Sequence, residues 1–234
     1  MRVFASGPNH WLEAGTYPLP GTSLLRLYLA SETGANSSIG DGKLQLQTPS
    51  HGRSHDVYVY DPADPTPSLW YDGLGGYESN VASREDVLVY ETMAFSEPVV
   101  VMGLVSAKLY ASSSAKDTDW FAYWHVVDDQ GQAVPLGRGT VRARFRNSPR
   151  FPEALTENEI CQYNLDLWHM GIRIEQGWRI RLEVASACFP AFSRNLNTGG
   201  CSETGTEYVA ANQRIYHTEA YPSQLILSIM DGEE

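Results

Sequence analysis

The sequence lacks the short motifs that mark most self-contained active sites. No G-x-S-x-G segment occurs, although an α/β-type serine hydrolase needs this strained turn to raise its nucleophile. Neither a phosphate-binding glycine motif nor H-E-x-x-H is present. The three cysteines, Cys161, Cys188 and Cys201, include no C-x-x-C pair, and any disulfide pairing leaves one thiol over. We therefore expect no complete active site of these types and no disulfide framework, and we expect Cys188 to be a buried thiol.

Basic residues and long apolar runs are also scarce. The chain has 17 Lys and Arg against 28 Asp and Glu, which gives a net charge of −11. Such a surface repels nucleic-acid phosphates and anionic lipid, so we expect neither nucleic acid nor a membrane as a partner. No apolar run approaches the roughly 20 residues that span a bilayer, and the first residues lack the apolar core of a signal peptide. These features predict a cytoplasmic location.

The sequence does contain strong period-two alternation, which is typical of half-buried strands. The clearest examples are residues 104–112, 139–146 and 178–184. Shorter strands are expected at 24–29, 57–60, 87–90, 120–127, 163–167 and 225–229. No long helical stripe appears, although residues 203–213 could form a short helix. This pattern predicts an all-β fold in which residues 1–234 form a single domain of two packed antiparallel sheets, of the β-sandwich or jelly-roll kind.

Several polar groups resemble functional sites, but a structural role explains each more simply. His51 and His55 are flanked by Ser and Gly, which favours a solvated loop over the helix face that an i, i+4 metal site requires. Asp117 and Asp119 lie in a polar turn, where such side chains satisfy backbone groups. We expect neither a metal nor a cofactor.

Arg142, Arg144 and Arg146 share one face of the expected strand at 139–146. They could bind an anion. In an acidic protein we expect them instead to pair with carboxylates on the adjacent strand or to cover aromatic rings with their stems.

Segments spread in order along the chain carry a resemblance to a known family. They are Y-V-Y-D-P-A-D-P-T-P-S at 58–68, R-E-D-V-L-V-Y-E-T at 84–92, S-S-S-A-K-D-T-D-W at 112–120 and F-P-A-F-S-R-N-L-N-T-G at 189–199, with G-P-N-H-W at 7–11. Together they resemble the carboxyl-terminal domain shared by X-Pro dipeptidyl-peptidases, cocaine esterase and α-amino-acid ester hydrolases. The resemblance implies a jelly-roll β-sandwich of the galactose-binding-like type.

The resemblance also implies a partner, namely an α/β-hydrolase catalytic domain that carries the Ser, Asp and His of a triad on the same or an adjacent polypeptide. None of the triad positions can be carried over, because the segment that holds them is not in this sequence. The motif residues receive structural roles. We expect Asp61 and Asp64 to fix a rigid turn, and Arg194, Asn195 and Asn197 to hold an irregular loop through hydrogen bonds to the backbone. We further expect Asp117 or Asp119 to pair with Arg194.

One loop departs from the family pattern. Residues 69–78 read L-W-Y-D-G-L-G-G-Y-E, where relatives have an earlier Gly-Gly and a longer insertion. In relatives this region can approach the substrate pocket, which makes Trp70, Tyr71 and Leu74 the candidate substrate-pocket contacts.

Three functions remain open at this point. The first is a non-catalytic domain that packs on a hydrolase domain and helps to wall its pocket. The second is a carbohydrate-binding module of jelly-roll type, because aromatic faces stack on sugar rings. The third is a stand-alone hydrolase with an unrecognised site.

Overall fold

In a computed structural model of the protein, residues 2–6, 10–13, 15–68 and 84–230 are described. These residues form strands joined by turns, with one short 3-10 helix and no α-helix among them, so the all-β prediction is confirmed. In chain order the strands are β1 (Arg2–Ala5), β2 (His10–Glu13), β3 (Thr22–Ala30), β4 (Lys43–Gln45), β5 (His55–Tyr60), β6 (Leu88–Glu91), β7 (Val99–Ser113), β8 (Asp119–Val127), β9 (Ala133–Arg142), β10 (Cys161–Ile174), β11 (Arg179–Ala185), β12 (Ala211–Tyr216) and β13 (Gln224–Met230). No helix in this described part of the chain is long and apolar enough to cross a membrane.

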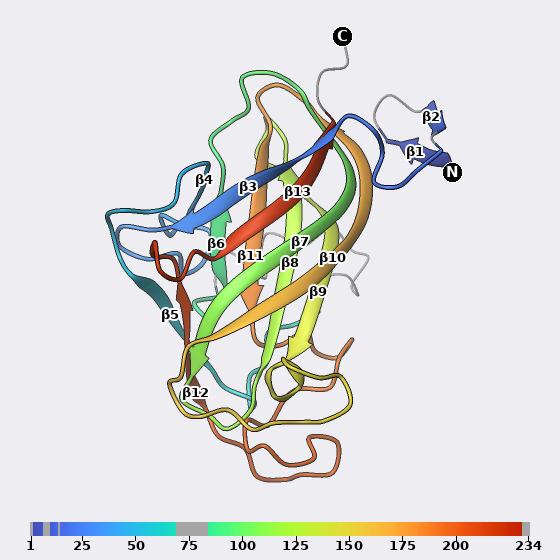
Figure 1. The fold of residues 1–234 in the computed structure, drawn as a ribbon. Helices are drawn as coiled ribbons and strands as arrows, with labels where there is room; N and C mark the ends of the chain where they lie inside the picture. Colours follow the sequence, from blue (N-terminus) through green and yellow to red (C-terminus); the bar gives the residue numbers. More distant parts are fainter. Residues whose placement is uncertain (1, 7–9, 14, 69–83, 231–234) are drawn as a thin grey trace.

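The strands form two facing layers, as a sandwich requires. Hydrogen bonds connect them in the order β5-β12-β7-β13-β3-β4-β6-β11-β8-β9, and β10 pairs with β7. The path turns from one layer to the other at β4, which makes only one pair with β6, between Lys43 and Glu91. In Figure 1, β3, β13, β7 and β10 cross diagonally in front of β6, β11, β8 and β9.

Strand β7 is the central element of the front layer. One of its edges pairs with β10 from Val99 to Ala111. The other edge is shared, because β13 pairs with its first two thirds and β12 with its end. Its inward residues alternate with outward ones, so Val105, Ala107 and Leu109 enter the core. The expected strand at 104–112 therefore exists and is longer than predicted.

The core lies between the layers and is rich in aromatic side chains. Trp120 and Trp124 of β8 are fully buried, and Trp120 packs against Tyr163 of β10 with the ring centres 5.6 Å apart. Cutting such a buried side chain to alanine costs roughly 3–5 kcal/mol. The aromatic residues of β8 thus tie the back layer to the front one.

One predicted strand ends earlier than expected, and one predicted helix is absent. The strand expected at 139–146 ends at Arg142, because Ala143–Phe145 form a 3-10 turn in which Arg146 bonds back to Ala143. The short helix expected at 203–213 is absent. Its last residues begin β12, whose burial alternates as a strand requires, and this segment pairs with both β5 and β7.

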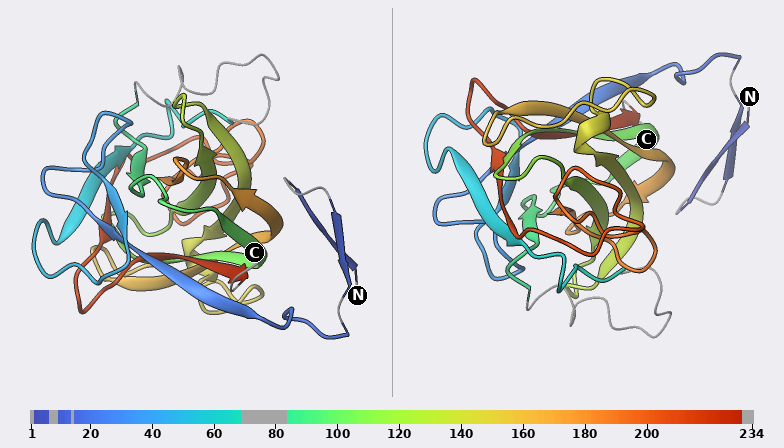
Figure 2. Two further views of the ribbon diagram at one scale, coloured as in Figure 1. Left: turned by 90° about the horizontal axis from the view of Figure 1, so that it is seen from above. Right: turned by 90° about the horizontal axis from the view of Figure 1, so that it is seen from below.

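Strands β1 and β2 form a separate two-stranded ribbon, which stands off from the sandwich in both views of Figure 2. The backbone of Ser6, which follows β1, accepts from Arg173 and donates to Gly171, and so attaches the ribbon to β10. The ribbon lies at the same end of the molecule as the end of β13 (Figure 1).

Strand β9 approaches the backbone of β10 very closely at two glycines. A Cβ at Gly137 would lie 2.5 Å from the carbonyl oxygen of Leu167, and a Cβ at Gly139 would overlap the carbonyl of Asp166. Only glycine allows this contact, which brings the free edge of the back layer against β10.

We predict that Gly139→Ala destabilises the protein by about 1–3 kcal/mol, because the methyl group forces two backbones apart. Gly15→Ala is the matched control, since a Cβ there meets no atom within 4 Å. Urea unfolding measures both free energies. Equal values for the two variants would contradict the close contact.

Candidate functional site

The candidate substrate-pocket residues Trp70, Tyr71 and Leu74 lie outside the described residues, so they stay predictions. The chain just before them is fixed by backbone bonds. Ser68 donates to Phe189 at 2.7 Å, and Phe189 donates to Thr66 at 3.0 Å. The family segments at 58–68 and 189–199 are therefore neighbours in space.

The turn after β5 is held by its own aspartates and by Arg84. The Asp61 carboxylate accepts from the backbone of Ala63 at 2.8 Å. Arg84 donates to the carbonyl oxygen of Asp64 at 2.8 Å and pairs with Asp86 at 2.6 Å. A cavity of about 620 Å³ opens beside this turn; its described lining residues are Asn36, Val57, Tyr58, Val59, Asp61, Asp64, Arg84, Glu85 and Asp86.

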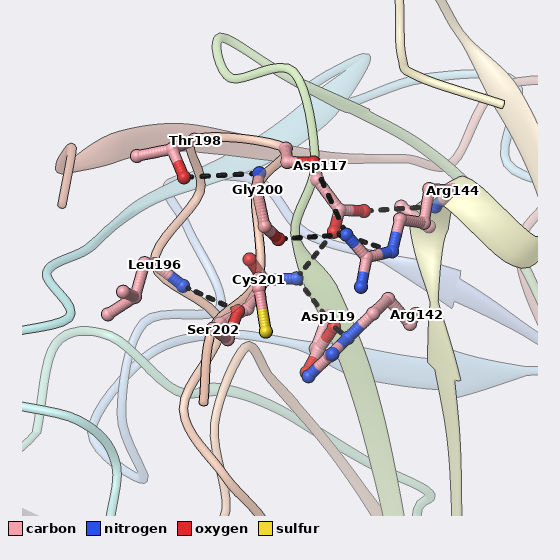
Figure 3. A network of polar contacts seen from close by, with 12 residues as sticks. Asp117, Asp119, Arg142, Arg144, Leu196, Thr198, Gly200, Cys201 and Ser202 are labelled. Carbon is pink, nitrogen blue, oxygen red and sulfur yellow. Dashed lines mark hydrogen bonds and ion pairs between the residues drawn. The ribbon is translucent and has the colours of Figure 1, made fainter. Parts of the chain in front are cut away.

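Asp117 and Asp119 form the centre of a buried polar network (Figure 3). Arg142 donates two hydrogen bonds to the Asp119 carboxylate, from Nε at 2.9 Å and from Nη2 at 3.1 Å. Arg144 holds Asp117 through its backbone N–H at 3.0 Å and through Nε at 3.5 Å. Arg144 also donates to the carbonyl oxygens of Gly199 and Gly200.

Asn195 connects the two aspartates to the loop that follows it. Its Nδ2 donates to Asp117 at 3.0 Å and to Asp119 at 2.8 Å, while its Oδ1 accepts from the backbone of Asn197. Asn197 adopts a φ of 63° and donates from its side chain to Val209. The start of β8, the end of β9 and the loop at 195–200 therefore share one polar centre.

The expected pairing of Arg194 with Asp117 or Asp119 is wrong. Arg194 donates to the carbonyl oxygen of Pro62 at 2.6 Å, while Arg142 and Arg144 pair with the aspartates. Since Asp119 faces Arg142 directly across the β8–β9 pair, the strand neighbour is closer than the loop arginine. The arginines at 142–146 do pair with carboxylates, as expected, but Arg144 does so from the 3-10 turn.

Burial and the nearby Asp117 carboxylate hold the pKa of Asp119 above its usual value, although Arg142 and Asn195 act in the opposite direction. Hydrogen bonding to Asp119 raises the pKa of Arg142. Two carboxylates can share this space because each has its own arginine and both accept from one amide.

A second buried network contains Ser31, Asp56 and His217, the residue types of a catalytic triad. All three are at most 2% exposed. The Asp56 carboxylate accepts from Ser31 at 2.8 Å, from Tyr90 at 2.8 Å and from the backbone of Ala35 at 3.1 Å. It also lies 3.0 Å from Nε2 of His217. Sequence reasoning missed this cluster, because no motif joins residues so far apart in the chain.

The geometry of this cluster does not support nucleophilic catalysis. In a triad the carboxylate binds one ring nitrogen, and the other faces the serine as a base. Here the same ring nitrogen, Nε2 of His217, lies 3.0 Å from the Asp56 carboxylate and 3.4 Å from Oγ of Ser31, so the two ring nitrogens are not divided between carboxylate and serine. Ser31 already donates to Asp56, so its hydroxyl proton is not directed to the histidine, and all three residues are almost fully buried.

The network stabilises a charged Asp56 within the core. Burial by itself raises the pKa of this carboxyl, but hydrogen bonds from His217, Ser31 and Tyr90 outweigh burial and lower it below its usual value. These partners come from β6, from the end of β3 and from the chain after β12. Asp56 therefore joins segments of both layers.

The six histidines do not form a metal centre within the described residues, where no group of three or more His, Cys, Asp or Glu could hold an ion. His51 lies in an exposed bend, as expected. His55 was expected in a loop but begins β5, where it is half-buried against Tyr216 with ring centres 5.2 Å apart.

Comparisons with known proteins agree on one group of relatives. The family described as the X-Pro dipeptidyl-peptidase C-terminal non-catalytic domain matches residues 1–226. Cocaine esterase of Rhodococcus sp. (strain MB1 Bresler) is 37% identical over 239 residues, which cover 98% of this chain and 42% of that protein.

Two solved structures share the fold over almost the whole chain. An aminopeptidase of the marine sediment archaeon Thaumarchaeota archaeon has a TM-score of 0.86 at 26% identity, covering 98% of this chain and 40% of its own. An α-amino acid ester hydrolase has a TM-score of 0.83 at 25% identity, covering 97% of this chain and 40% of its own. The chain thus spans about two fifths of the length of these relatives.

We predict that Asp56→Asn lowers the free energy of unfolding by about 2–4 kcal/mol at pH 7, because its four donors lose their charged acceptor. A lowered pKa in the folded state means that the charge of Asp56 stabilises the fold above the unfolded pKa near 4, and that this contribution is lost as the pH falls through the lower folded value. The gap between wild type and Asp56→Asn should therefore narrow below about pH 4. Urea unfolding across this range, with exposed Asp129→Asn as control, measures it. A gap independent of pH would show that Asp56 is not charged in the fold.

We predict that Asn195→Leu, which keeps the size but removes the amide, costs about 2–4 kcal/mol, because both aspartates and the backbone of Asn197 lose a partner. Thermal unfolding compares it with Asn164→Leu on the exposed side of β10. Similar midpoints for both variants would mean that the loop at 195–200 does not depend on this amide.

Proposed function

Because this chain belongs to the family of X-Pro dipeptidyl-peptidase C-terminal non-catalytic domains, we propose that it is the accessory β-sandwich of a serine hydrolase. Its partner is an α/β-hydrolase catalytic domain on the same polypeptide. The observation that carries this proposal is that the family match spans nearly the whole chain, while the chain covers only about two fifths of its relatives. The remaining length of those relatives has room for a catalytic domain.

The parent reaction is transfer of an acyl group to water, on an ester, an amide or a peptide bond. Relatives with an esterase name, an aminopeptidase name and an ester hydrolase name support this range of substrates. A serine nucleophile and an oxyanion hole on the catalytic domain perform the chemistry. The accessory domain contributes shape and a rigid wall to the substrate pocket.

The part of this chain that meets the substrate pocket is the loop with Trp70, Tyr71 and Leu74. Support comes from the rigid residues before and after it. Before the loop, the backbone of Ser68 is bonded to Phe189. After it, Arg84 is bonded to Asp64 and Asp86, so both flanking segments are attached to the rest of the fold. The motif residues have a structural role and no catalytic role; they are Asp61, Asp64, Asp117, Asp119, Arg194, Asn195 and Asn197.

We also assign residues 1–234 to one domain of jelly-roll, galactose-binding-like type, supported by the single hydrogen-bonded path through β3–β13. The cytoplasmic location stays part of the proposal. Its support is that Cys161, Cys188 and Cys201 are all free thiols, of which Cys188 is buried.

Ester hydrolysis tests the assignment. We expect the complete polypeptide that contains this chain to hydrolyse p-nitrophenyl butyrate and to lose this activity with a serine-directed sulfonyl fluoride. The 234-residue chain alone should give no turnover above background. Turnover by the chain alone that a single substitution in it abolishes would restore the stand-alone hydrolase. Micromolar binding in a glycan array, with no hydrolase domain in the reading frame, would favour a carbohydrate-binding module.

A further inference from the structure

Strand β10 contains an irregularity in its pairing with β7. Between Asp166 and His169 the register with β7 shifts, and Leu167 and Trp168 lie opposite the single residue Val105. Leu167 fills the core, but Trp168 points outward with 72% of its surface exposed. The bulge therefore places a large aromatic side chain in solvent.

The backbone of Trp168 is held in an unfavourable conformation. Its φ is 73°, in the left-handed region that bulky residues rarely adopt. The Asp166 carboxylate maintains this geometry by accepting from the Trp168 N–H at 2.8 Å. Strain at an exposed aromatic residue points to a role outside the isolated fold.

Further aromatic side chains extend this surface toward the ribbon. His169 is also exposed, and its ring lies 5.3 Å from that of Tyr17. On the ribbon, Phe4 and Trp11 pack edge to face with centres 5.3 Å apart, and Trp11 is 60% exposed. An apolar cavity of about 270 Å³ lies between the ribbon and the sheet, lined by Phe4, Tyr17, Leu19, Gly103, His169, Met170 and Gly171. We call Phe4, Trp11, Tyr17, Trp168 and His169 the ribbon–bulge surface.

We propose that the ribbon–bulge surface is the face onto which the preceding catalytic domain of the full-length polypeptide packs, with the exposed Trp168 as an anchor. This inference rests on the proposed function and adds the location of the contact. The occupant follows from the order of the chain. The family is described as a C-terminal domain, so the additional length of its relatives precedes the matched segment, and the ribbon is the first described element of that segment.

The chemistry of the surface agrees with this occupant. Interfaces between domains commonly bury 600–1,500 Å² in total, and exposed aromatic groups supply most of the energy at such contacts. Exposed aromatic clusters next to an open cavity are unusual on a protein that remains alone.

The test uses Trp168→Gly in two proteins, the 234-residue chain and the full-length polypeptide. Glycine accepts the left-handed backbone without strain, so the midpoint of unfolding of the 234-residue chain should stay near that of the wild type. In the full-length polypeptide the same change removes the anchor. Phe151→Ala is the matched control, because Phe151 is 69% exposed on a different loop.

Hydrogen exchange of residues 100–106 and 166–172 provides the readout. In the wild type, exchange in the full-length polypeptide should be at least about ten-fold slower than in the 234-residue chain, because docking covers these amides. Trp168→Gly should abolish most of this slowing, and Phe151→Ala should preserve it. Trp11→Ala gives a second measurement. Because the ribbon lies outside the sandwich core, the loss of this side chain should leave the sandwich folded.

Equal protection of these residues in the two wild-type proteins would overturn the proposed location of the contact, even with full ester hydrolysis. A full-length polypeptide without any hydrolase domain would overturn the proposed function as well. If light scattering shows that the 234-residue chain is a dimer that Trp168→Gly dissociates, the surface belongs to a second copy and the proposal is wrong.

Discussion

The architecture depends on carboxylates that are buried and fully hydrogen-bonded. A charge in the core is tolerated only where several donors surround it. Asp56 meets this condition with Ser31, Tyr90, the backbone of Ala35 and His217. Asp117 and Asp119 meet it with Asn195, with Arg142 at the end of β9 and with Arg144 of the 3-10 turn that follows. At both places, loops that no regular hydrogen-bond ladder could fix are attached to the sheets.

The same principle explains why residue types alone do not identify a catalytic site. Ser31, His217 and Asp56 lie within hydrogen-bonding distance of one another, yet Oγ of Ser31 and Nε2 of His217 both face the Asp56 carboxylate. Catalysis needs a nucleophile that is exposed to substrate and a base that is free to accept its proton. In this network the carboxylate accepts from Ser31 and faces the same ring nitrogen of His217 that faces the serine, so the arrangement stabilises the fold.

Much of the fold could be predicted from the sequence, because alternation reports directly which strand face is buried. Val105, Ala107 and Leu109 were visible in this way. The turn at Ala143–Phe145 was not, since its residues continue the alternation while Asp117 accepts from the backbone of Arg144 and ends the strand. The motifs indicated which polar residues matter, but they could not predict which residues these polar groups bind. Arg194 and Arg142 have the same chemistry, and only the β8–β9 pairing places Arg142 next to Asp119.

The bulge in β10 has a cause within this chain, but the tryptophan that occupies it does not. Gly137 and Gly139 let β9 come so close that the backbone of β10 at 166–167 is held in place. With Leu167 fixed in the core, the residue that follows has to leave the sheet, and a glycine or asparagine would do so with the least strain. A tryptophan in that position gains nothing from this chain alone, because most of its surface meets solvent. Its strain is offset only if another surface covers it, and the domain that precedes this one in the longer relatives would supply that surface.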